Sequence, residues 1–191
     1  MKQLLWAAVA LSAACSSAIR VQEPIDPQEY AKCPLVGRFS LRGVTFAKKE
    51  NGEIVSGAGR EVHLDLFTKY SRAVFEAIFE RQKDGATFRT QREDETVSLN
   101  EVMRACRRTV TADADGKFVF RDTLPGVYVA SAYLSWKDPS GHWVGRWNFS
   151  LVGMHGMNRR RPLELSDMPD FVPRAPSRMT IPPAQENEEE P

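Results

Sequence analysis

Hydrophobic and polar residues alternate along several short stretches of the chain, which is the pattern of β-strands with one buried face. Val62, Leu64 and Leu66 alternate with polar residues, and Phe118 and Phe120 do the same further along the chain. Turn residues such as Asn-Gly and Asp-Pro separate these stretches. The pattern predicts strands over 39–46, 61–66, 109–112, 117–121, 127–136 and 143–151.

The hydrophobic period changes from strand-like to helical between about residues 70 and 107. Ser71 is the expected N-cap of a first helix, and the capping-box pattern from Ser98 to Glu101 predicts a second. Gly43 interrupts the first strand and is the expected position of a bulge. The helices are therefore predicted to be a short insertion in a mainly β domain.

Short strands with turns at this spacing favour a β-sandwich over alternating β/α units. The predicted domain covers residues 35–165. Residues 166–191 are rich in proline and close on glutamates, which predicts a disordered tail.

The N-terminus has the pattern of an export signal over residues 1–14. Lys2 precedes an uncharged apolar run from Leu4 to Leu11. That run is shorter than the roughly 20 residues of a membrane-spanning helix and has the length of a signal-peptide core. The mature protein is therefore expected outside the cytoplasm.

Small residues lead into Cys15, and the sequence Leu11-Ser12-Ala13-Ala14-Cys15 resembles a bacterial lipobox. The resemblance implies a lipidated Cys15 that anchors the protein in a membrane. Ser12 departs from the motif, so ordinary cleavage near Ala14 or Ala18 is the alternative. Ser16 in place of aspartate implies the periplasmic face of the outer membrane, and the proline-bearing residues 15–34 suit a tether.

Two further cysteines, Cys33 and Cys106, remain once Cys15 is set aside. In an oxidising compartment they either pair as a disulfide or stay as separate thiols. The net charge of +1, from 26 basic and 25 acidic residues, gives no overall field that would favour nucleic acid as a partner.

The stretch from Thr111 to Phe120, followed by Leu124-Pro125-Gly126-Val127-Tyr128, resembles a carboxypeptidase regulatory-like domain. Its hallmark is a D-x-x-G-x-[FY]-x-F hairpin followed by L-P-x-G-x-Y, and the second corner is one residue tighter here. The resemblance implies a transthyretin-like (prealbumin-like) sandwich of about seven strands. In its namesake enzymes the module accompanies a catalytic domain, so the resemblance brings no catalytic residues.

The sequence contains no catalytic constellation and no metal-ligand spacing. Asp113 and Asp115 are too few for calcium and are explained by a hairpin turn. The histidines, His63, His142 and His155, show no ligand spacing with one another. We therefore expect neither an enzyme nor a cofactor.

Aromatic residues carry the main functional signal. Tyr133, Trp136, Trp143 and Trp147 gather on one predicted hairpin. Exposed aromatics bind sugars or protein partners, whereas alternate placement also fits the core face of a strand. Trp136, next to the turn, is expected to be the most exposed.

A basic run, Arg159-Arg160-Arg161, either contacts an anionic membrane surface, at about 1 kcal/mol per basic residue, or is simply solvated. Together with Tyr133, Trp136 and Trp143 it makes up the predicted binding surface. The sequence thus predicts a non-enzymatic envelope lipoprotein that binds or assembles with an envelope protein. The alternative is a carbohydrate- or peptide-binding accessory of an envelope enzyme.

Overall fold

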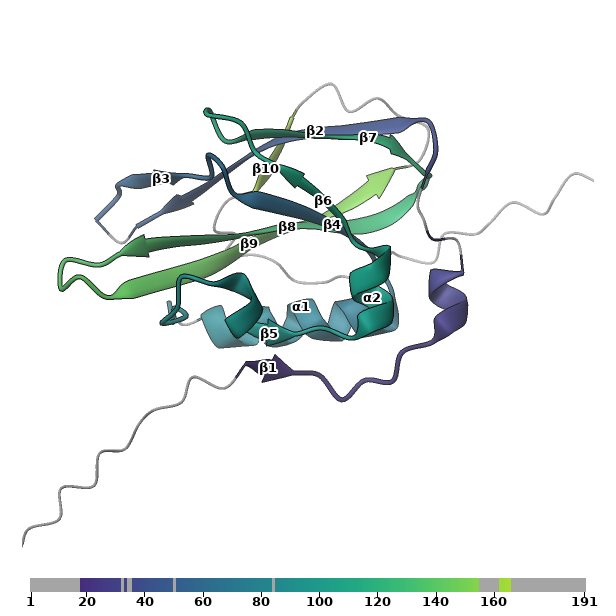
Figure 1. Cartoon of the computed structure of the whole chain (residues 1–191), viewed down its shortest axis with the longest axis horizontal. Coiled ribbons are helices and arrows are strands. Elements are labelled where there is room, and N and C mark those ends of the chain that lie inside the picture. Colours follow the sequence, from purple (N-terminus) through teal and green to yellow (C-terminus); the bar gives the residue numbers. More distant parts are fainter. Residues whose placement is uncertain are drawn as a thin grey trace, which may run out of the picture.

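The computed structural model describes residues 18–31, 33, 36–49, 51–83, 85–154 and 162–165 (Figure 1). The predicted signal segment, Cys15, the run Arg159–Arg161 and the predicted tail lie outside these residues. The elements are β1 (Ile19–Arg20), η1 (Pro27–Tyr30), β2 (Phe39–Lys48), β3 (Ile54–Ser56), β4 (Glu61–Leu66), α1 (Lys69–Gln82), η2 (Glu93–Glu95), β5 (Val97–Ser98), α2 (Glu101–Cys106), β6 (Arg108–Thr111), β7 (Lys117–Thr123), β8 (Gly126–Lys137), β9 (Trp143–Met154) and β10 (Leu163–Leu165).

The described part of the chain is mainly β, with two α-helices between strands, as the change of hydrophobic period predicts. One sheet is built on β2, which pairs with β10 on one edge and with β3 and β7 on the other. The second sheet has the order β6-β4-β8-β9 and is antiparallel throughout. The two sheets lie in adjacent layers (Figure 1).

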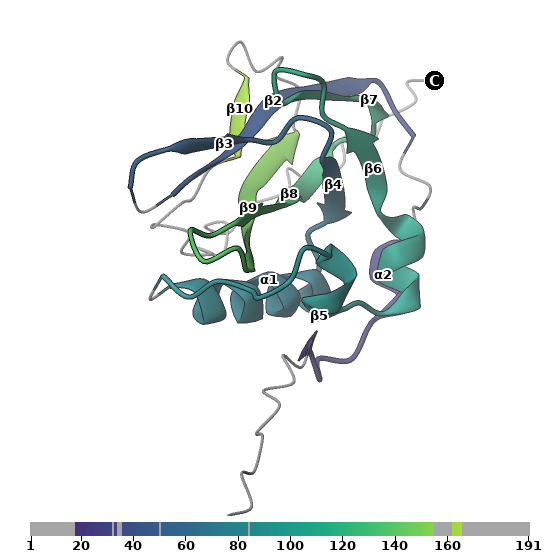
Figure 2. The same cartoon turned by 60° about the vertical axis from the view of Figure 1, so that its left-hand side comes forward.

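Helices α1 and α2 form a third layer on the far side of the second sheet (Figures 1 and 2). Phe75 of α1 packs against Phe149 of β9, with ring centroids 5.6 Å apart. The Gln82 amide exchanges two hydrogen bonds with the backbone of Trp147, at 2.8 and 3.0 Å. The second sheet is therefore covered on both faces.

Because both faces of the second sheet are covered, the prediction that residues 61–66 form a strand with only one buried face is wrong. The alternation is real, and Val62 and Leu64 are fully buried. The polar face is not solvated, however, because His63 and Asp65 are only 3% and 1% exposed. The helical insertion covers them, so they need polar partners within the protein.

Both helices begin at a different residue from the one predicted. Thr68 is the N-cap of α1, and Ser71, the third residue of the helix, completes a capping box with it. The two side chains satisfy each other's backbone N–H groups, at 2.8 and 3.1 Å. Asn100 caps α2, because Ser98 is extended and pairs with Arg20 in β1–β5.

The bulge in β2 lies between Phe39 and Leu41 rather than at Gly43. Gly43 has a packing role. A Cβ atom there would lie 2.4 Å from the Phe118 ring and 2.5 Å from the Leu163 carbonyl oxygen. The glycine lets β7 and β10 approach β2 closely from both sides.

The segment predicted as a tether lies against the domain where the structure describes it. Ile19 and Arg20 pair in parallel with Val97 and Ser98. Tyr30 is 5% exposed, and its hydroxyl lies 2.8 Å from Thr68 Oγ1. The folded body therefore begins well before residue 35, because Tyr30 belongs to the core and Ile19 packs against it. We call residues 18–33 the N-terminal arm.

Candidate functional site

A cleft of about 540 Å³ lies where the β2–β3 turn, the β8–β9 turn and the loop after α1 meet. Trp136 forms part of its wall and is neither fully buried nor fully exposed. We call this hollow the Trp136 cleft. Its lining combines an aromatic ring, aliphatic surface and charged side chains, and consists of Lys48, Lys49, Asn51, Glu53, Gly85, Thr87, Arg89, Trp136, Lys137, Asp138, Pro139, Val144 and Arg146.

The unbroken register of β8 and β9 decides which aromatics reach the cleft. Trp136 is opposite Val144, and Lys137 is opposite Trp143. Successive side chains point to opposite faces of a strand, so Trp136 and Trp143 lie on opposite faces of the hairpin. Lys137 Nζ stands 5.6 Å from the centre of the Trp143 ring. Of the three aromatic residues in the predicted surface, Trp136 is the one that lines the cleft.

Tyr133 does not belong to an exposed surface, which corrects its place in the predicted set. It is 4% exposed, and its hydroxyl donates a 2.8 Å hydrogen bond to the Thr90 carbonyl. Its ring packs between Phe88 and Trp147, at 6.2 and 5.6 Å. The loop after α1 covers this face of β8, because Phe88 bridges to Gly145 of β9. Trp147 is a core residue, as alternation allows.

The Trp136 cleft carries more positive than negative charge. Its two carboxylates each have a basic neighbour, with Lys49–Glu53 at 2.8 Å and Arg89–Asp138 at 3.1 Å. The hydroxyl of Ser140 also donates to Asp138 and holds the pKa of that carboxyl below its usual range. The basic lining residues are Lys48, Lys49, Arg89, Lys137 and Arg146. The cleft can therefore donate hydrogen bonds to the hydroxyl groups of a ligand and accept hydrogen bonds from them. Its cationic side chains outnumber its carboxylates.

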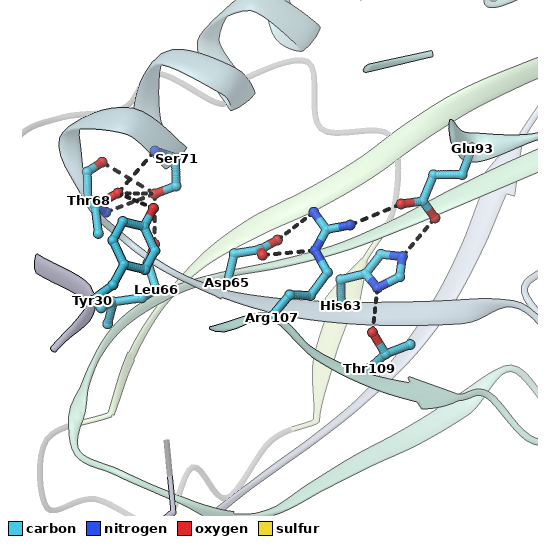
Figure 3. Close-up of polar contacts among 9 residues, drawn as sticks. All are labelled: Tyr30, His63, Asp65, Leu66, Thr68, Ser71, Glu93, Arg107 and Thr109. Atoms are coloured by element: carbon cyan, nitrogen blue, oxygen red, sulfur yellow. Dashed lines mark hydrogen bonds and ion pairs between the residues drawn. The ribbon is translucent and has the colours of Figure 1, made fainter. Parts of the chain in front are cut away.

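A second polar cluster lies on the helix side of the second sheet, and Figure 3 shows it. His63 Nε2 lies 2.7 Å from Glu93 Oε2, and His63 Nδ1 lies 3.0 Å from Thr109 Oγ1. Arg107 donates a bidentate pair of 2.9 Å hydrogen bonds to Asp65 and a third of 3.1 Å to Glu93. Five residues, His63, Asp65, Glu93, Arg107 and Thr109, thus satisfy one another where the insertion meets the sheet.

The Asp65–Arg107 pair is almost completely buried. Burial alone would lower the pKa of the Arg107 guanidinium, but the carboxylates of Asp65 and Glu93 outweigh burial and raise that pKa. The guanidinium therefore stays charged despite its burial. Removing one partner would leave an uncompensated buried charge, which typically costs about 3–5 kcal/mol.

Sequence reasoning missed this cluster. His63 is expected from sequence to be solvated or partly buried, and Glu93 lies thirty residues away in a charged loop. Two features of the sequence could have indicated the cluster. Polar residues alternate along β4, and Arg107 follows directly after the second helix. A strand that is polar on one face can face solvent or a polar partner, and only the position of the insertion decides between them.

The Asp113–Gly116 turn behaves as the sequence predicts. Asp113 Oδ1 accepts hydrogen bonds from the backbone N–H groups of Asp115 and Lys117, at 3.0 and 2.9 Å. Gly116 has φ of +76°, which favours glycine. Lys117 pairs with Asp115 at 2.7 Å. The carboxylates of the turn thus accept hydrogen bonds from the backbone and the Lys117 side chain of the same turn.

The structure brings Cys33 and Cys106 together as a disulfide, with Cα atoms 5.5 Å apart. This bond joins the end of the N-terminal arm to the last residue of α2. Of the other predicted site residues, Cys15 and Arg159 to Arg161 lie outside the described part of the chain.

Comparison with protein-family models finds no match, and comparison with curated proteins finds none either. Among solved structures, the chain is similar to a crystal structure from Pseudomonas aeruginosa described as a "putative carbohydrate binding protein". The TM-score is 0.58 at 21% sequence identity, and the match covers 75% of this chain and 98% of that chain. At this identity the likeness shows a shared fold.

Proposed function

We propose that this chain is a non-enzymatic, exported binding protein that holds carbohydrate in the Trp136 cleft. The observation that carries the proposal is the partly exposed Trp136 ring in a hollow edged by charged side chains. A sugar ring has an apolar C–H face and a polar rim. An aromatic face covers the first, and a few charged or amide groups bind the second.

The fold that we infer is a transthyretin-like β-sandwich made of the two four-stranded sheets, with the helices as an insertion. Two features of the hallmark motif support this inference. Phe118 and Phe120 are buried and in edge-to-face contact, with centroids 5.9 Å apart. Tyr128 is buried, and its hydroxyl donates 2.9 Å to the Leu124 carbonyl at the second corner. The similarity to the Pseudomonas aeruginosa structure, whose description mentions carbohydrate binding, agrees with a binding role.

Glycan screening of the full chain followed by calorimetry tests the proposal, with Trp136→Ala against Trp143→Ala. The two tryptophans share one hairpin but lie on opposite faces of it. Loss of a stacking aromatic typically costs about 2 kcal/mol, or roughly thirtyfold in Kd. We expect that loss for Trp136→Ala and little change for Trp143→Ala. Equal effects of both variants, with both still folded by circular dichroism, would overturn the proposal.

We further propose that the protein works in the bacterial envelope, anchored by a lipid on Cys15 at the periplasmic face of the outer membrane. The lipobox-like sequence before Cys15 supports this proposal. Neither α1 nor α2, the helices of the described residues, has the length and apolar character of a membrane-spanning helix. Mass spectrometry of the mature N-terminus tests the anchor, and an unmodified Cys15 or cleavage beyond it would refute it.

The competing role is assembly with an envelope protein. Cross-linking in intact cells, followed by purification of the chain, would favour this role if one partner is recovered equally with the parent and with Trp136→Ala. Recovery that depends on Trp136 would instead place the partner, or its glycan, in the cleft.

A further inference from the structure

One histidine and two carboxylates meet in a hollow of about 690 Å³ on the helix side of the second sheet. Nitrogen or oxygen atoms of Glu61, His63 and Glu93 all lie within 4.8 Å of one another. Glu61 and His63 are two residues apart on β4 and share one face of the sheet. Glu93 comes from η2, which covers that face. We call this group the His63 cluster.

The neighbours of the His63 cluster hold two of its members in place. Thr109 Oγ1 lies 3.0 Å from His63 Nδ1, which leaves Nε2 directed at Glu93 (Figure 3). Arg107 donates to Glu93 Oε1, so Oε2 is the oxygen that faces the imidazole. Asp65 fixes Arg107 in turn. Oriented imidazole and carboxylate ligands, each hydrogen-bonded from behind, are typical of protein metal sites.

Charge favours a cation at this place. Glu61, Glu93 and Asp65 contribute three carboxylates, and Arg107 contributes one positive charge that it shares between Asp65 and Glu93. Among the other lining residues, Arg92 is paired with Asp94, while Arg104 donates to the Leu99 carbonyl and keeps its positive charge, so one negative charge remains in excess. A divalent ion would therefore offset negative charge that the surrounding side chains leave only partly balanced.

We propose that the His63 cluster binds a divalent transition-metal ion of the zinc class. An imidazole nitrogen with two carboxylate oxygens suits zinc better than calcium or magnesium, which prefer oxygen ligands alone. Three protein ligands leave a coordination position for water or for a ligand donor atom. The proposal is independent of the sugar cleft, because it uses the other face of the sheet.

Binding requires small changes at the cluster. Zinc bonds of about 2.0–2.1 Å put tetrahedral ligand atoms roughly 3.3 Å apart. The His63–Glu93 hydrogen bond of 2.7 Å must therefore open, and the exposed Glu61 side chain must turn inward. A neutral His63 protonated at Nε2 must change to the Nδ1–H tautomer by proton exchange with solvent, and an imidazolium releases its Nε2 proton to solvent. Nδ1 can then donate to Thr109, whose hydroxyl is able to donate or accept.

Zinc competition against a chromophoric chelator tests the proposal on the full chain. The protein is prepared without a histidine tag and with the change Cys15→Ser, which removes a thiol that could bind zinc elsewhere. We expect one zinc per chain, with affinity reduced at least tenfold by Glu61→Gln or His63→Gln. His142→Gln is the matched control, because His142 is exposed on the β8–β9 turn. It should leave the affinity unchanged.

Glu61→Gln keeps the proposal testable if His63→Gln fails to fold, since Glu61 is exposed and its replacement leaves the His63–Glu93 contact intact. Zinc should raise the Tm of the parent and raise that of Glu61→Gln much less. Thr109→Val should lower zinc affinity about tenfold by releasing the imidazole. Zinc binding equal in the parent and Glu61→Gln, or lost in His142→Gln, would overturn the proposal.

Discussion

Removing the Cys33–Cys106 disulfide should destabilise the domain strongly. The bond closes a loop between residues 73 apart in sequence. For that separation the chain-entropy relation gives about 4.4 kcal/mol at 25 °C. A domain of this size loses roughly 2–4 °C in Tm per kcal/mol. The double variant Cys33→Ala/Cys106→Ala should therefore melt roughly 9–18 °C below the parent.

The structure also indicates where the damage should appear first. The disulfide joins the N-terminal arm to the end of α2, and the arm otherwise depends on the short β1–β5 pairing and on Tyr30. Trypsin should therefore cut the variant within the arm before it cuts the sheets. Alanine is the better replacement at Cys106, because a serine hydroxyl would be buried there.

Calorimetry and timed proteolysis measure these two effects, both in a Cys15→Ser background so that no third thiol exchanges. Thiol titration of the denatured, unreduced protein should find no free cysteine in that background. Two free thiols, or a double variant that melts within about 2 °C of the parent, would refute the reasoning, since the entropy relation predicts several times that shift.

Four further predictions concern the packing and charges of the domain. Arg107→Leu should lower the free energy of unfolding by about 3–5 kcal/mol in urea titrations, because it leaves Asp65 buried without its cation. Gly43→Ala should cost about 1–3 kcal/mol in the same assay, because its Cβ would overlap the Phe118 ring. Burial raises the pKa of Tyr30 to about 12. Stability from Tyr30 is thus present below pH 10 and lost as pH rises toward 12, which ultraviolet phenolate titration alongside denaturation can follow. Salt should weaken binding of an acidic oligosaccharide to the Trp136 cleft more than binding of its neutral analogue, as calorimetry at two ionic strengths would show.

Local patterns carry most of what the sequence predicts correctly. The strands from Lys117 to Met154 follow from alternation and from turn residues that lie between paired positions. The Asp113 turn and its glycine are equally local. Helix starts are less well defined, because Ser71 and Ser98 each fit a cap pattern. Thr68 caps α1 through a local capping box, whereas Ser98 pairs with Arg20 and Asn100 caps α2.

Features that depend on distant partners could not be predicted. The N-terminal arm looks like a tether from its prolines, and its pairing with Val97 and Ser98 joins segments far apart in the chain. Tyr133 and Trp136 look alike on the same strand, but they lie on opposite faces of it, and Phe88 and Trp147 pack against the Tyr133 ring. The partner of His63 lies in a loop without any periodic pattern.

The two proposed sites are separated by the second sheet. His63 pairs in register with Ser131, so it shares a face with Tyr133 and Lys137, whereas Trp136 belongs to the other face. The helical insertion supplies Glu93 to the first site, and the long hairpin supplies Trp136 to the second. The first site thus depends on the insertion, and the second depends on the end of the β8–β9 hairpin. The two functions should therefore be lost independently, so Trp136→Ala should retain zinc and Glu61→Gln should retain the glycan.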